Sequence, residues 1–421
     1  MRPVAQEYLL QIPLWTRKKN TLEQVRDFLT ELGDPEQAFP VIHVAGTNGK
    51  GSVCADLTAM LVCGGYHVGT FISPHLVDIR ERFLLDGRMV EQEAFQASFD
   101  QVYDLVQRML ARGYCHPTFF EFLFLMAMVL FAGEKSDYVI LETGLGGRLD
   151  TTNVIRHPAA AVITSISLDH MKYLGDTIPL IAGEKAGIIK PAIPVIYDDN
   201  CPEASEVIRS HADRLGAPAY PVTERESCRE VVFAAPYQAM NAALAVKTLE
   251  VLNVPDMSRE VIREGLQTVK WPGRMEQAGE DIWLDGAHNP GGIQAFLRAA
   301  GEIEKKNPRN VHFLFAAVAD KDYNEMIQTL CDALHPSCVT VARLESERSL
   351  EQDVLTNAFL RAGCGCVTGF SDTGEALDCA LAHKSGADRL YIVGSLYLIG
   401  EIKEHLRRRG YAGLRRGNQP F

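Results

Sequence analysis

At 421 residues, the chain is longer than a single hydrophobic core usually serves, so its length predicts two domains. Apolar residues make up 47% and charged residues 23%, which is ordinary for a folded globular protein and excludes an intrinsically disordered one. With 42 basic against 54 acidic residues, the net charge of −12 argues against nucleic acid as a partner.

The cysteines and the apolar runs indicate the cellular compartment of the protein. Its ten cysteines form no C-x-x-C pair, and the closest spacing, Cys364-Gly365-Cys366, has no second pair or nearby histidine to complete a metal site. Residues 1–11 lack the pattern of a secretory signal, and the longest apolar run, residues 122–131, is too short to cross a bilayer. We therefore expect a cytoplasmic protein with reduced thiols and no membrane contact. A solvated helix face is the interpretation of the basic residues Arg407, Arg408, Arg409, Arg415 and Arg416.

The first long feature is an amphipathic helix, followed by a strand that ends in a glycine-rich turn. Residues 1–40 are expected to be helical, with apolar residues at helical spacing over residues 22–32 and an end at Gly33. The apolar run at residues 41–45 then stops in Gly46-Thr47-Asn48-Gly49-Lys50-Gly51-Ser52, and a helix is expected over residues 53–62.

This turn predicts a phosphate-binding loop. Its glycines let backbone N–H groups crowd round an anionic oxygen, Lys50 adds a positive charge, and the next helix directs its positive end to the same place. The pattern departs from G-x-x-x-x-G-K-[ST], because Val44 occupies the first glycine position and Gly51 follows the lysine. We expect a nucleoside triphosphate as the ligand; the alternative is an ordinary strand-to-helix turn.

A second apolar stretch, residues 66–72, leads into Ser73-Pro74-His75-Leu76. Pro74 restricts Ser73 to extended backbone, so the serine hydroxyl is presented from a loop, where binding residues are common. Two helices are expected next, an amphipathic one over residues 91–112 and a buried one over residues 118–131. Glu121 in the second is costly to bury without a partner, so it is either paired structurally or faces a site.

Two apolar strands then deliver polar residues at their carboxyl ends. Residues 138–141 lead to Glu142, and residues 160–166 lead to Asp169-His170. Because ligands of parallel sheets bind at the carboxyl ends of the strands, we expect Glu142 and His170 near the phosphate loop. His170 is interpreted as a metal ligand rather than a structural histidine. Lys185 follows on a short helix and, taken alone, is a surface lysine.

Trp271-Pro272-Gly273-Arg274-Met275-Glu276 marks the expected domain boundary, because Pro-Gly ends the preceding helix and a new strand pattern follows. A helix is expected to open at Asn241, for which an ordinary N-cap is the alternative to a ligand contact. Beyond the boundary, strands are expected over residues 281–285, 311–318, 338–342 and 390–395. The first ends in Asp285-Gly286-Ala287-His288-Asn289, which brings an acid and an imidazole to another carboxyl edge; the alternative is helix capping.

These elements predict an α/β fold in two parts. Residues 1–270 are expected to form a nucleotide-binding domain with a phosphate loop and a mostly parallel sheet, and residues 276–421 a smaller, Rossmann-like domain. Residues 271–275 are the expected hinge, from which Arg274 would reach the nucleotide phosphates.

The motifs together resemble those of one family. The glycine-rich turn is similar to the variant phosphate loop of the Mur ligase superfamily, and its Gly-Ser ending resembles the folylpolyglutamate synthase and dihydrofolate synthase branch. Only 45 residues precede Gly46, too few for the extra domain of the Mur ligases that bind a UDP-sugar precursor. Further segments that resemble the family are Ser73-Pro74-His75-Leu76, Glu81-Arg82, Thr118-Phe119-Phe120-Glu121, Glu184-Lys185-Ala186-Gly187-Ile188, Pro272-Gly273-Arg274, Asp320-Lys321-Asp322 and Gly394-Ser395-Leu396.

The resemblance implies an ATP-dependent ligase that joins a folate or pterin carboxylate to the amino group of L-glutamate through an acyl phosphate, releasing ADP and phosphate. The implied catalytic residues are Lys50, Lys185 and His288. The implied ATP-binding residues are Gly49, Lys50, Gly51, Ser52, Asn241, Arg274 and Asp285. The implied metal ligands are Ser73, Glu142, His170 and carbamylated Lys185. The implied folate-binding residues are Thr118, Phe119, Phe120, Glu121, Leu149, Asp150 and Thr151.

The implied cofactors are ATP and magnesium at two sites. Carbamylation would suit Lys185, because magnesium prefers oxygen ligands and an ammonium would repel it. A monovalent cation is left open as a further cofactor, and we expect a monomer.

Tetrahydrofolate is the expected substrate. Bifunctional members often carry Asp-x-Gly-Leu-Glu-Arg where this chain has Lys19-Asn20-Thr21-Leu22-Glu23-Gln24, so activity on dihydropteroate stays an alternative. A nucleotide-binding regulatory ATPase is the alternative of another class.

Overall fold

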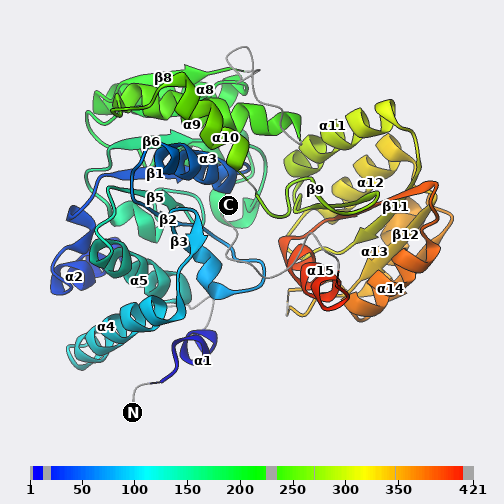
Figure 1. Cartoon of the computed structure of the whole chain (residues 1–421), viewed down its shortest axis with the longest axis horizontal. Helices are drawn as coiled ribbons and strands as arrows, with labels where there is room; N and C mark the ends of the chain where they lie inside the picture. The colour runs from blue at the N-terminus through cyan, green and yellow to red at the C-terminus, as the bar shows by residue number, and fades with distance from the viewer. Residues whose placement is uncertain (1–2, 13–19, 224–234, 270, 347, 411–421) are drawn as a thin grey trace.

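The computed structural model describes residues 3–12, 20–223, 235–269, 271–346 and 348–410. Lys19, Arg415 and Arg416 lie outside the described residues. Two sheets covered by helices lie side by side, the larger one from the earlier part of the chain and the smaller one from the later part (Figure 1). Within the described ranges, no helix combines the length and the apolar character needed to cross a membrane.

The larger sheet has eight strands in the order β4-β3-β2-β5-β1-β6-β7-β8. Their bounds are β1 (Val41–Ala45), β2 (Val68–Phe71), β3 (Phe83–Leu85), β4 (Arg88–Met89), β5 (Tyr138–Glu142), β6 (Ala160–Ile163), β7 (Val195–Asp198) and β8 (Ala219–Val222). Strands β3 and β4 are antiparallel at one edge, and the other six strands run parallel.

The helices of this part include the one that carries the phosphate loop. They are α1 (Ala5–Leu10), α2 (Leu22–Glu31), α3 (Lys50–Cys63), α4 (Gln92–Ala111), α5 (Phe119–Gly133), α6 (Met171–Leu174), α7 (Ile178–Ala186), α8 (Pro202–Leu215), α9 (Pro236–Leu252) and α10 (Arg259–Thr268). Short 3-10 turns are η1 (Pro35–Gln37), η2 (Ile79–Arg82) and η3 (Thr151–Val154).

Apolar residues on both faces of the central strands bury the larger sheet, because successive side chains of a strand point to opposite faces. Val41 and Leu141 pack with residues of α4 and α5 on one face. Ile42 and Ile140 pack with residues of α3, α9 and α10 on the other. The central strands are thereby fixed, and their carboxyl ends form a rigid edge for loops.

The smaller sheet has six strands in the order β13-β12-β11-β14-β10-β9, parallel except for β9. Its strands are β9 (Glu276–Gly279), β10 (Ile282–Asp285), β11 (Asn310–Phe315), β12 (Cys338–Ala342), β13 (Val367–Phe370) and β14 (Asp388–Val393). Its helices are α11 (Pro290–Lys306), α12 (Tyr323–Leu334), α13 (Gln352–Arg361), α14 (Thr373–His383) and α15 (Leu396–Arg408).

The predicted fold class is confirmed: both sheets are mostly parallel and alternate with helices. The boundary at residues 271–275 stays a prediction, and β9 begins directly after it, at Glu276. The two parts meet where α15 approaches the loop after β2. A Cβ added at Gly400 would collide with the carbonyl oxygen of Leu76, so glycine permits this close contact.

Helix α10 packs on α3 through Gly265. A Cβ added there would lie 2.6 Å from Cα of Met60. We expect Gly265→Ala to lower the free energy of unfolding by roughly 1–3 kcal/mol, because the new methyl group overpacks against backbone. Urea denaturation measures this change. The control is Gly301→Ala in α11, where an added Cβ meets nothing within 4 Å; it should be neutral or stabilise by about 0.5–1 kcal/mol. Equal effects of the two substitutions would contradict the prediction.

Candidate active site

The phosphate loop leaves the carboxyl end of β1, which lies between β5 and β6. At two of its glycines a side chain would have no room, and the backbone also has a positive φ. Gly46 (φ +151°) has the side chain of Thr164 where a Cβ would lie, and Gly49 (φ +91°) has the amide of Asn241. The loop therefore lies directly against the segment after β6 and against α9.

Helix α3 begins at Lys50, rather than at residue 53 as expected, with Gly49 as its N-cap. The first turn therefore includes Gly51 and Ser52, and its backbone N–H groups have no partners within the helix. The ammonium of Lys50 folds back and donates to the carbonyl oxygens of Gly46 (3.1 Å) and Thr47 (3.2 Å). Free N–H groups and an ammonium facing one turn are what a phosphate needs.

Glu142 and Ser73, two predicted metal ligands, are in contact. The carboxylate Oε2 of Glu142, at the end of β5, accepts a hydrogen bond from the backbone N–H of Ser73 (2.8 Å). Burial raises the pKa of Glu142, and the positive charges of Lys50 and Arg274 oppose that shift. The carboxylate therefore lies within the field of the phosphate loop.

Lys185 is buried in the last turn of α7 and is not the surface lysine that its local sequence indicates. Its Nζ donates to the carbonyl oxygen of Gly46 (2.7 Å), which Lys50 also contacts. Burial, followed by the charge of Lys50, lowers the pKa of Lys185 to about 7. A large fraction of this side chain is therefore an uncharged amine at neutral pH.

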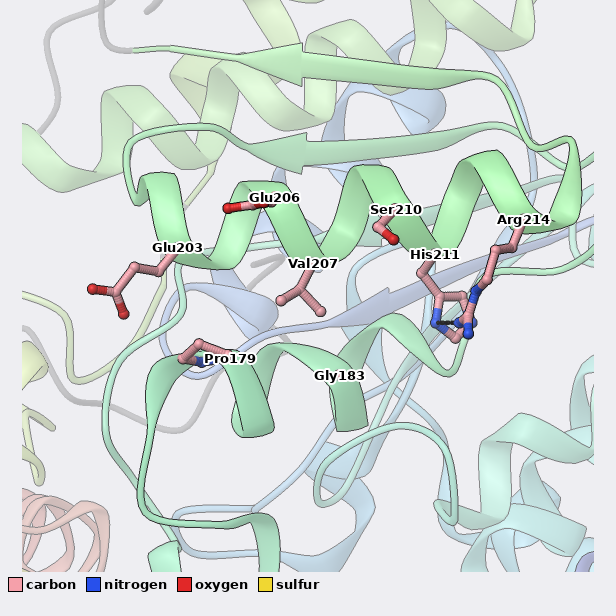
Figure 2. Close-up of a pocket in the computed structure, with 8 residues that line it drawn as sticks. All are labelled: Pro179, Gly183, Glu203, Glu206, Val207, Ser210, His211 and Arg214. Atoms are coloured by element: carbon pink, nitrogen blue, oxygen red, sulfur yellow. Dashed lines mark hydrogen bonds between the residues drawn. The ribbon is translucent and has the colours of Figure 1, made fainter.

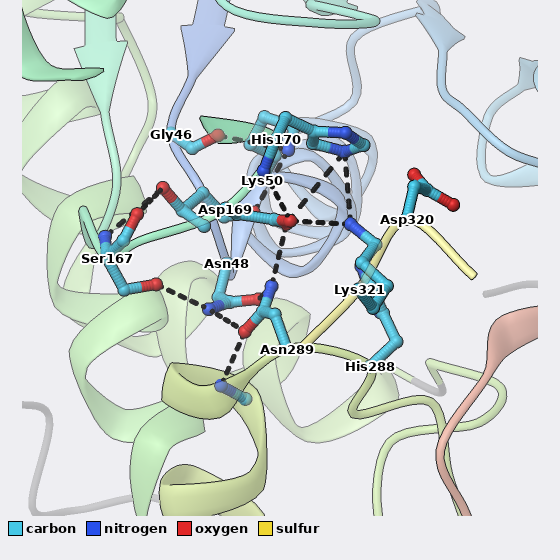
Figure 3. A network of polar contacts seen from close by, with 12 residues as sticks. Gly46, Asn48, Lys50, Ser167, Asp169, His170, His288, Asn289, Asp320 and Lys321 are labelled. Carbon is cyan, nitrogen blue, oxygen red and sulfur yellow. Dashed lines mark hydrogen bonds and ion pairs between the residues drawn. The ribbon is translucent and has the colours of Figure 1, made fainter. Parts of the chain in front are cut away.

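Asp169 and His170 follow β6 and contact Lys321, which lies between β11 and α12 of the smaller sheet's part (Figure 3). Lys321 Nζ donates to Asp169 Oδ1 (2.6 Å) and lies 3.2 Å from His170 Nε2. Burial lowers the pKa of His170 to about 4, so its imidazole is neutral at pH 7 and suited to a metal ion. Burial raises the pKa of Asp169, but Lys321 and two neighbouring histidines hold it well below its usual value.

A pair of asparagine amides joins the phosphate loop to α11. Asn48 Nδ2 donates to Asn289 Oδ1, and Asn289 Nδ2 donates to Asn48 Oδ1, both at 3.1 Å (Figure 3). Asn289 Nδ2 also donates to Asp169 (2.9 Å), and Asn289 Oδ1 accepts from the N–H of Gly292 (2.7 Å), which caps α11. The Asn289 side chain thus contacts the phosphate loop, the Asp169 carboxylate and the first turn of α11.

Arg274, Asp285 and His288 gather where β10 ends. The Asp285 carboxylate accepts from the backbone N–H of Met275 (2.9 Å), so the expected hinge is bonded to this strand end. Burial raises the pKa of Asp285, and the charge of Arg274 opposes that shift. Burial lowers the pKa of His288 to about 3, so this imidazole is neutral at pH 7.

Asn241 lies inside α9, whose N-cap is Ala235, so the expectation that a helix opens at Asn241 is wrong. Pro236 at the first helical position starts the helix earlier. The Asn241 amide donates to Gln238 (2.9 Å) and lies beside Gly49. An N-cap role is therefore excluded, and contact with the nucleotide stays a prediction.

The predicted folate-binding residues lie at the start of α5 and around η3. Thr118 and Glu121 form the capping box of α5, and Glu121 also accepts from the amide of Asn20 (3.1 Å). Glu121 is therefore paired within the chain. Asp150 orders its own loop, because it accepts from the N–H of Thr152 (3.0 Å). Of the others, Phe119 is buried, Phe120 lies against Gly144, Leu149 is exposed and Thr151 begins η3. Folate binding by this set stays a prediction.

No group of three or more His, Cys, Asp or Glu side chains among the described residues could hold a metal ion. Ser73, Glu142 and His170 nonetheless offer oxygen and imidazole donors near the phosphate loop. Magnesium commonly binds through one or two carboxylates and completes its shell with phosphate oxygens and water. The donors therefore fit an ion that arrives with a nucleotide rather than one held by a preformed cage.

A separate groove of about 680 Å³ runs between α7 and α8 (Figure 2). It is lined by Pro179, Gly183, Glu203, Glu206, Val207, Ser210, His211 and Arg214. None of the predicted site residues is in this lining, so the groove is distinct from the candidate site.

Several residues of the site carried no assigned role in the sequence: Asn48, Asp169, Asn289 and Lys321. Two signals were present, because Lys321 lies in the family-like Asp320-Lys321-Asp322 segment and Asn289 follows His288. No spacing rule connects Asn48 with Asn289, which are 241 positions apart.

Comparisons with known proteins agree with this architecture. Residues 273–396 match the family model of the Mur ligase, glutamate ligase domain. The dihydrofolate synthase/folylpolyglutamate synthase of Bacillus subtilis is 35% identical over 424 residues, which cover 92% of this chain and 95% of that protein.

Two solved structures are similar over nearly their whole length. E. coli FolC in complex with DHPP and ADP has a TM-score of 0.84 and 30% identity, and the match covers 97% of this chain and 98% of that one. A bifunctional folylpolyglutamate synthase/dihydrofolate synthase with Mn, AMPPNP and L-glutamate bound has a TM-score of 0.82 and 29% identity, over 96% and 98% of the two chains. This chain therefore belongs to the folylpolyglutamate synthase/dihydrofolate synthase family of ligases.

Proposed function

We propose that the chain joins L-glutamate to the carboxylate of tetrahydrofolate at the expense of ATP, which is the reaction of a folylpolyglutamate synthase. The observation that carries the proposal is one cluster: Lys50 influences the pKa values of Glu142, His170 and Lys185. These groups share a site with a loop suited to a triphosphate. The ligands of the two related structures, a nucleotide, DHPP, L-glutamate and Mn, are of the kinds that this reaction requires.

A carboxylate is a poor electrophile, so it must first be activated. In the proposed sequence, a folate carboxylate oxygen attacks the γ-phosphorus of ATP, ADP leaves, and an acyl phosphate forms. The glutamate amine then attacks the acyl carbon, phosphate leaves as the C–O bond breaks, and the new amide loses a proton. Lys50 and the first turn of α3 offset the charge on the transferred phosphoryl group.

Ser73 and Glu142 are proposed to hold one magnesium ion, and His170 and carbamylated Lys185 a second, with Glu142 shared between the two. Magnesium, when bound, neutralises and orients phosphate oxygens. In the described state Lys321 lies 3.2 Å from His170 Nε2. Lys321 would have to move away before that nitrogen could bind a metal ion.

Lys185 is proposed to act as a carbamate. The uncharged amine, available because burial lowers its pKa to about 7, adds to CO₂, loses a proton and becomes an anion. Lys50 and Lys185 both donate to the carbonyl oxygen of Gly46, so converting one ammonium into an anion also removes the repulsion between them.

A second activity, on dihydropteroate, is the other candidate, and the start of α2 bears on it. Thr21 and Gln24, which depart from the bifunctional pattern, form a capping box in which each side chain accepts from the other residue's backbone N–H (2.9 and 3.2 Å). These two departures therefore have a local structural role, whereas the third, Lys19 in place of Asp, lies outside the described residues. The Bacillus subtilis relative carries both activities in its name. Parallel assays with dihydropteroate and tetrahydrofolate distinguish one activity from two.

Phosphate release from ATP tests the proposed function. A ligase should need both folate and L-glutamate for turnover, whereas a regulatory ATPase would release phosphate without them. We expect Lys50→Ala to lower turnover at least ~100-fold, because it removes charge from the phosphoryl site, while circular dichroism stays unchanged. Lys247→Ala, which changes a lysine paired with Glu250 on α9, is the control and should retain turnover. Wild-type turnover by Lys50→Ala would refute the role of that residue.

Carbamylation of Lys185 predicts a dependence on pH and CO₂. Only the neutral amine reacts, so activity should rise as pH increases through about 7 and fall when CO₂ is removed from the buffer. Lys185→Ala should be inactive and should regain turnover in acetate or formate, whose carboxylates can occupy the vacated space. Full activity of Lys185→Ala without any additive would exclude carbamylation as essential.

Two substitutions of Asn289 can distinguish its contribution to stability from its contribution to catalysis. Both Asn289→Ala and Asn289→Ser remove the amide bonds to Asn48 and Asp169, so both should lower kcat/KM by about tenfold or more. Serine can still cap α11, so the alanine variant should be less stable than the serine variant by about 1 kcal/mol. Steady-state kinetics and urea denaturation provide the two measurements. Wild-type kinetics in the serine variant would show that capping is the residue's whole contribution.

A further inference from the structure

The smaller sheet carries a pair of cysteines outside the candidate site, at the start of its two outer strands. Cys338 begins β12, and Cys366 directly precedes β13. We propose that Cys338 and Cys366 form a reversible disulfide by exchange with a small dissolved disulfide such as oxidised glutathione. This proposal does not depend on the ligase reaction.

The backbone holds the two cysteines opposite each other. Val339 pairs with Val367 in the parallel register of β12 and β13, and the N–H of Val339 donates to the carbonyl oxygen of Cys366 (2.9 Å). Neighbouring strands are separated by about 4.8 Å, which falls within the Cα separation of about 4.4–6.8 Å that a disulfide needs. The sulfur atoms lie 2.7 Å apart. The bond can therefore form without moving either strand.

Access distinguishes this pair from a second one nearby. Cys366 is exposed on the outermost strand of the sheet, and Cys338 is partly buried behind it. Cys331 and Cys364 also approach each other, with sulfur atoms 3.3 Å apart, but both are buried. A dissolved disulfide can thus reach Cys366 first, whereas the inner pair is shielded.

The chemistry is a two-electron exchange. The Cys366 thiolate attacks one sulfur of the small disulfide, which breaks that S–S bond and releases one small thiol. Cys338 then loses its proton and attacks the Cys366 sulfur, which forms the protein disulfide and releases the second small thiol. Two protein thiols are oxidised, the small disulfide is reduced to two thiols, and the two protons end on those thiols. Burial, together with the contact to Cys366, raises the pKa of Cys338 to about 12, which is consistent with Cys366 reacting first.

The cysteine pair lies at the opposite ends of the strands from the candidate active site, so we expect the disulfide to affect stability rather than the ligase reaction. The two cysteines lie at the amino ends of β12 and β13, whereas Asp285 is the last residue of β10 and Lys321 follows the carboxyl end of β11. A disulfide here would fasten the outermost strand to its neighbour and close the intervening segment, which contains α13. The expected consequence is greater stability of this edge, since exposed edge strands are the weakly held strands of a sheet.

Peptide mass spectrometry of the full-length protein under non-reducing conditions tests the proposal. After equilibration with oxidised glutathione, we expect a linked peptide that contains Cys338 and Cys366 and that disappears on treatment with reduced glutathione. Cys366→Ser and Cys338→Ser should each abolish it. The matched control is Cys379→Ser, which removes a neighbouring cysteine whose thiol contacts His383 and should leave the linked peptide intact.

A thermal denaturation experiment on the same samples supplies an independent measurement. The oxidised wild type should melt roughly 5–10 °C above the reduced protein, and Cys366→Ser should show no such shift. The proposal is overturned if glutathione stays attached to Cys366 as a mixed disulfide without the internal link. It is also overturned if the linked peptide joins Cys366 to Cys379 instead.

Discussion

The site depends on a single carbonyl oxygen that serves two lysines. Lys50 and Lys185 both donate to the carbonyl oxygen of Gly46, and Thr164 lies where a side chain of residue 46 would be. Burial, followed by the nearby charge of Lys50, lowers the pKa of Lys185. In the proposed reaction, Lys50 contacts the phosphate, and Lys185, whose pKa burial lowers to about 7, is the lysine open to modification. One backbone oxygen thus contacts both lysines of the proposed reaction.

The second organising feature is that the polar groups come from both parts of the chain. Glu142 and His170 follow strands of the larger sheet, whereas Asn289 and Lys321 belong to the smaller one. The amide pair between Asn48 and Asn289 and the ion pair between Asp169 and Lys321 join the two parts. The proposed metal binding by His170 Nε2 requires that Lys321 leave its contact with this nitrogen.

Much of the fold could be predicted because buried parallel strands are short apolar runs. The strands that end at Glu142 and Asp285 were found in this way, and their carboxyl ends then indicated the site. Strand β13 was missed because its middle residues, Thr368 and Gly369, are exposed and give no apolar run. The burial of Lys185 was missed because it depends on how α7 packs. The amide pair was missed because it depends on how two separately predicted sheets are placed.

The contact between Gly400 and Leu76 has a consequence for the modularity of the chain. Helix α15 is the last helix that packs on the smaller sheet among the described residues. The loop that it contacts, at Leu76, also contains Ser73. A hybrid enzyme that takes its two halves from different relatives would have to match helix and loop at this point. A bulkier residue in place of Gly400 would push the serine loop away from its neighbours. The sequences of the two parts are therefore constrained to match at the contact between Gly400 and Leu76, although neither residue takes part in the reaction.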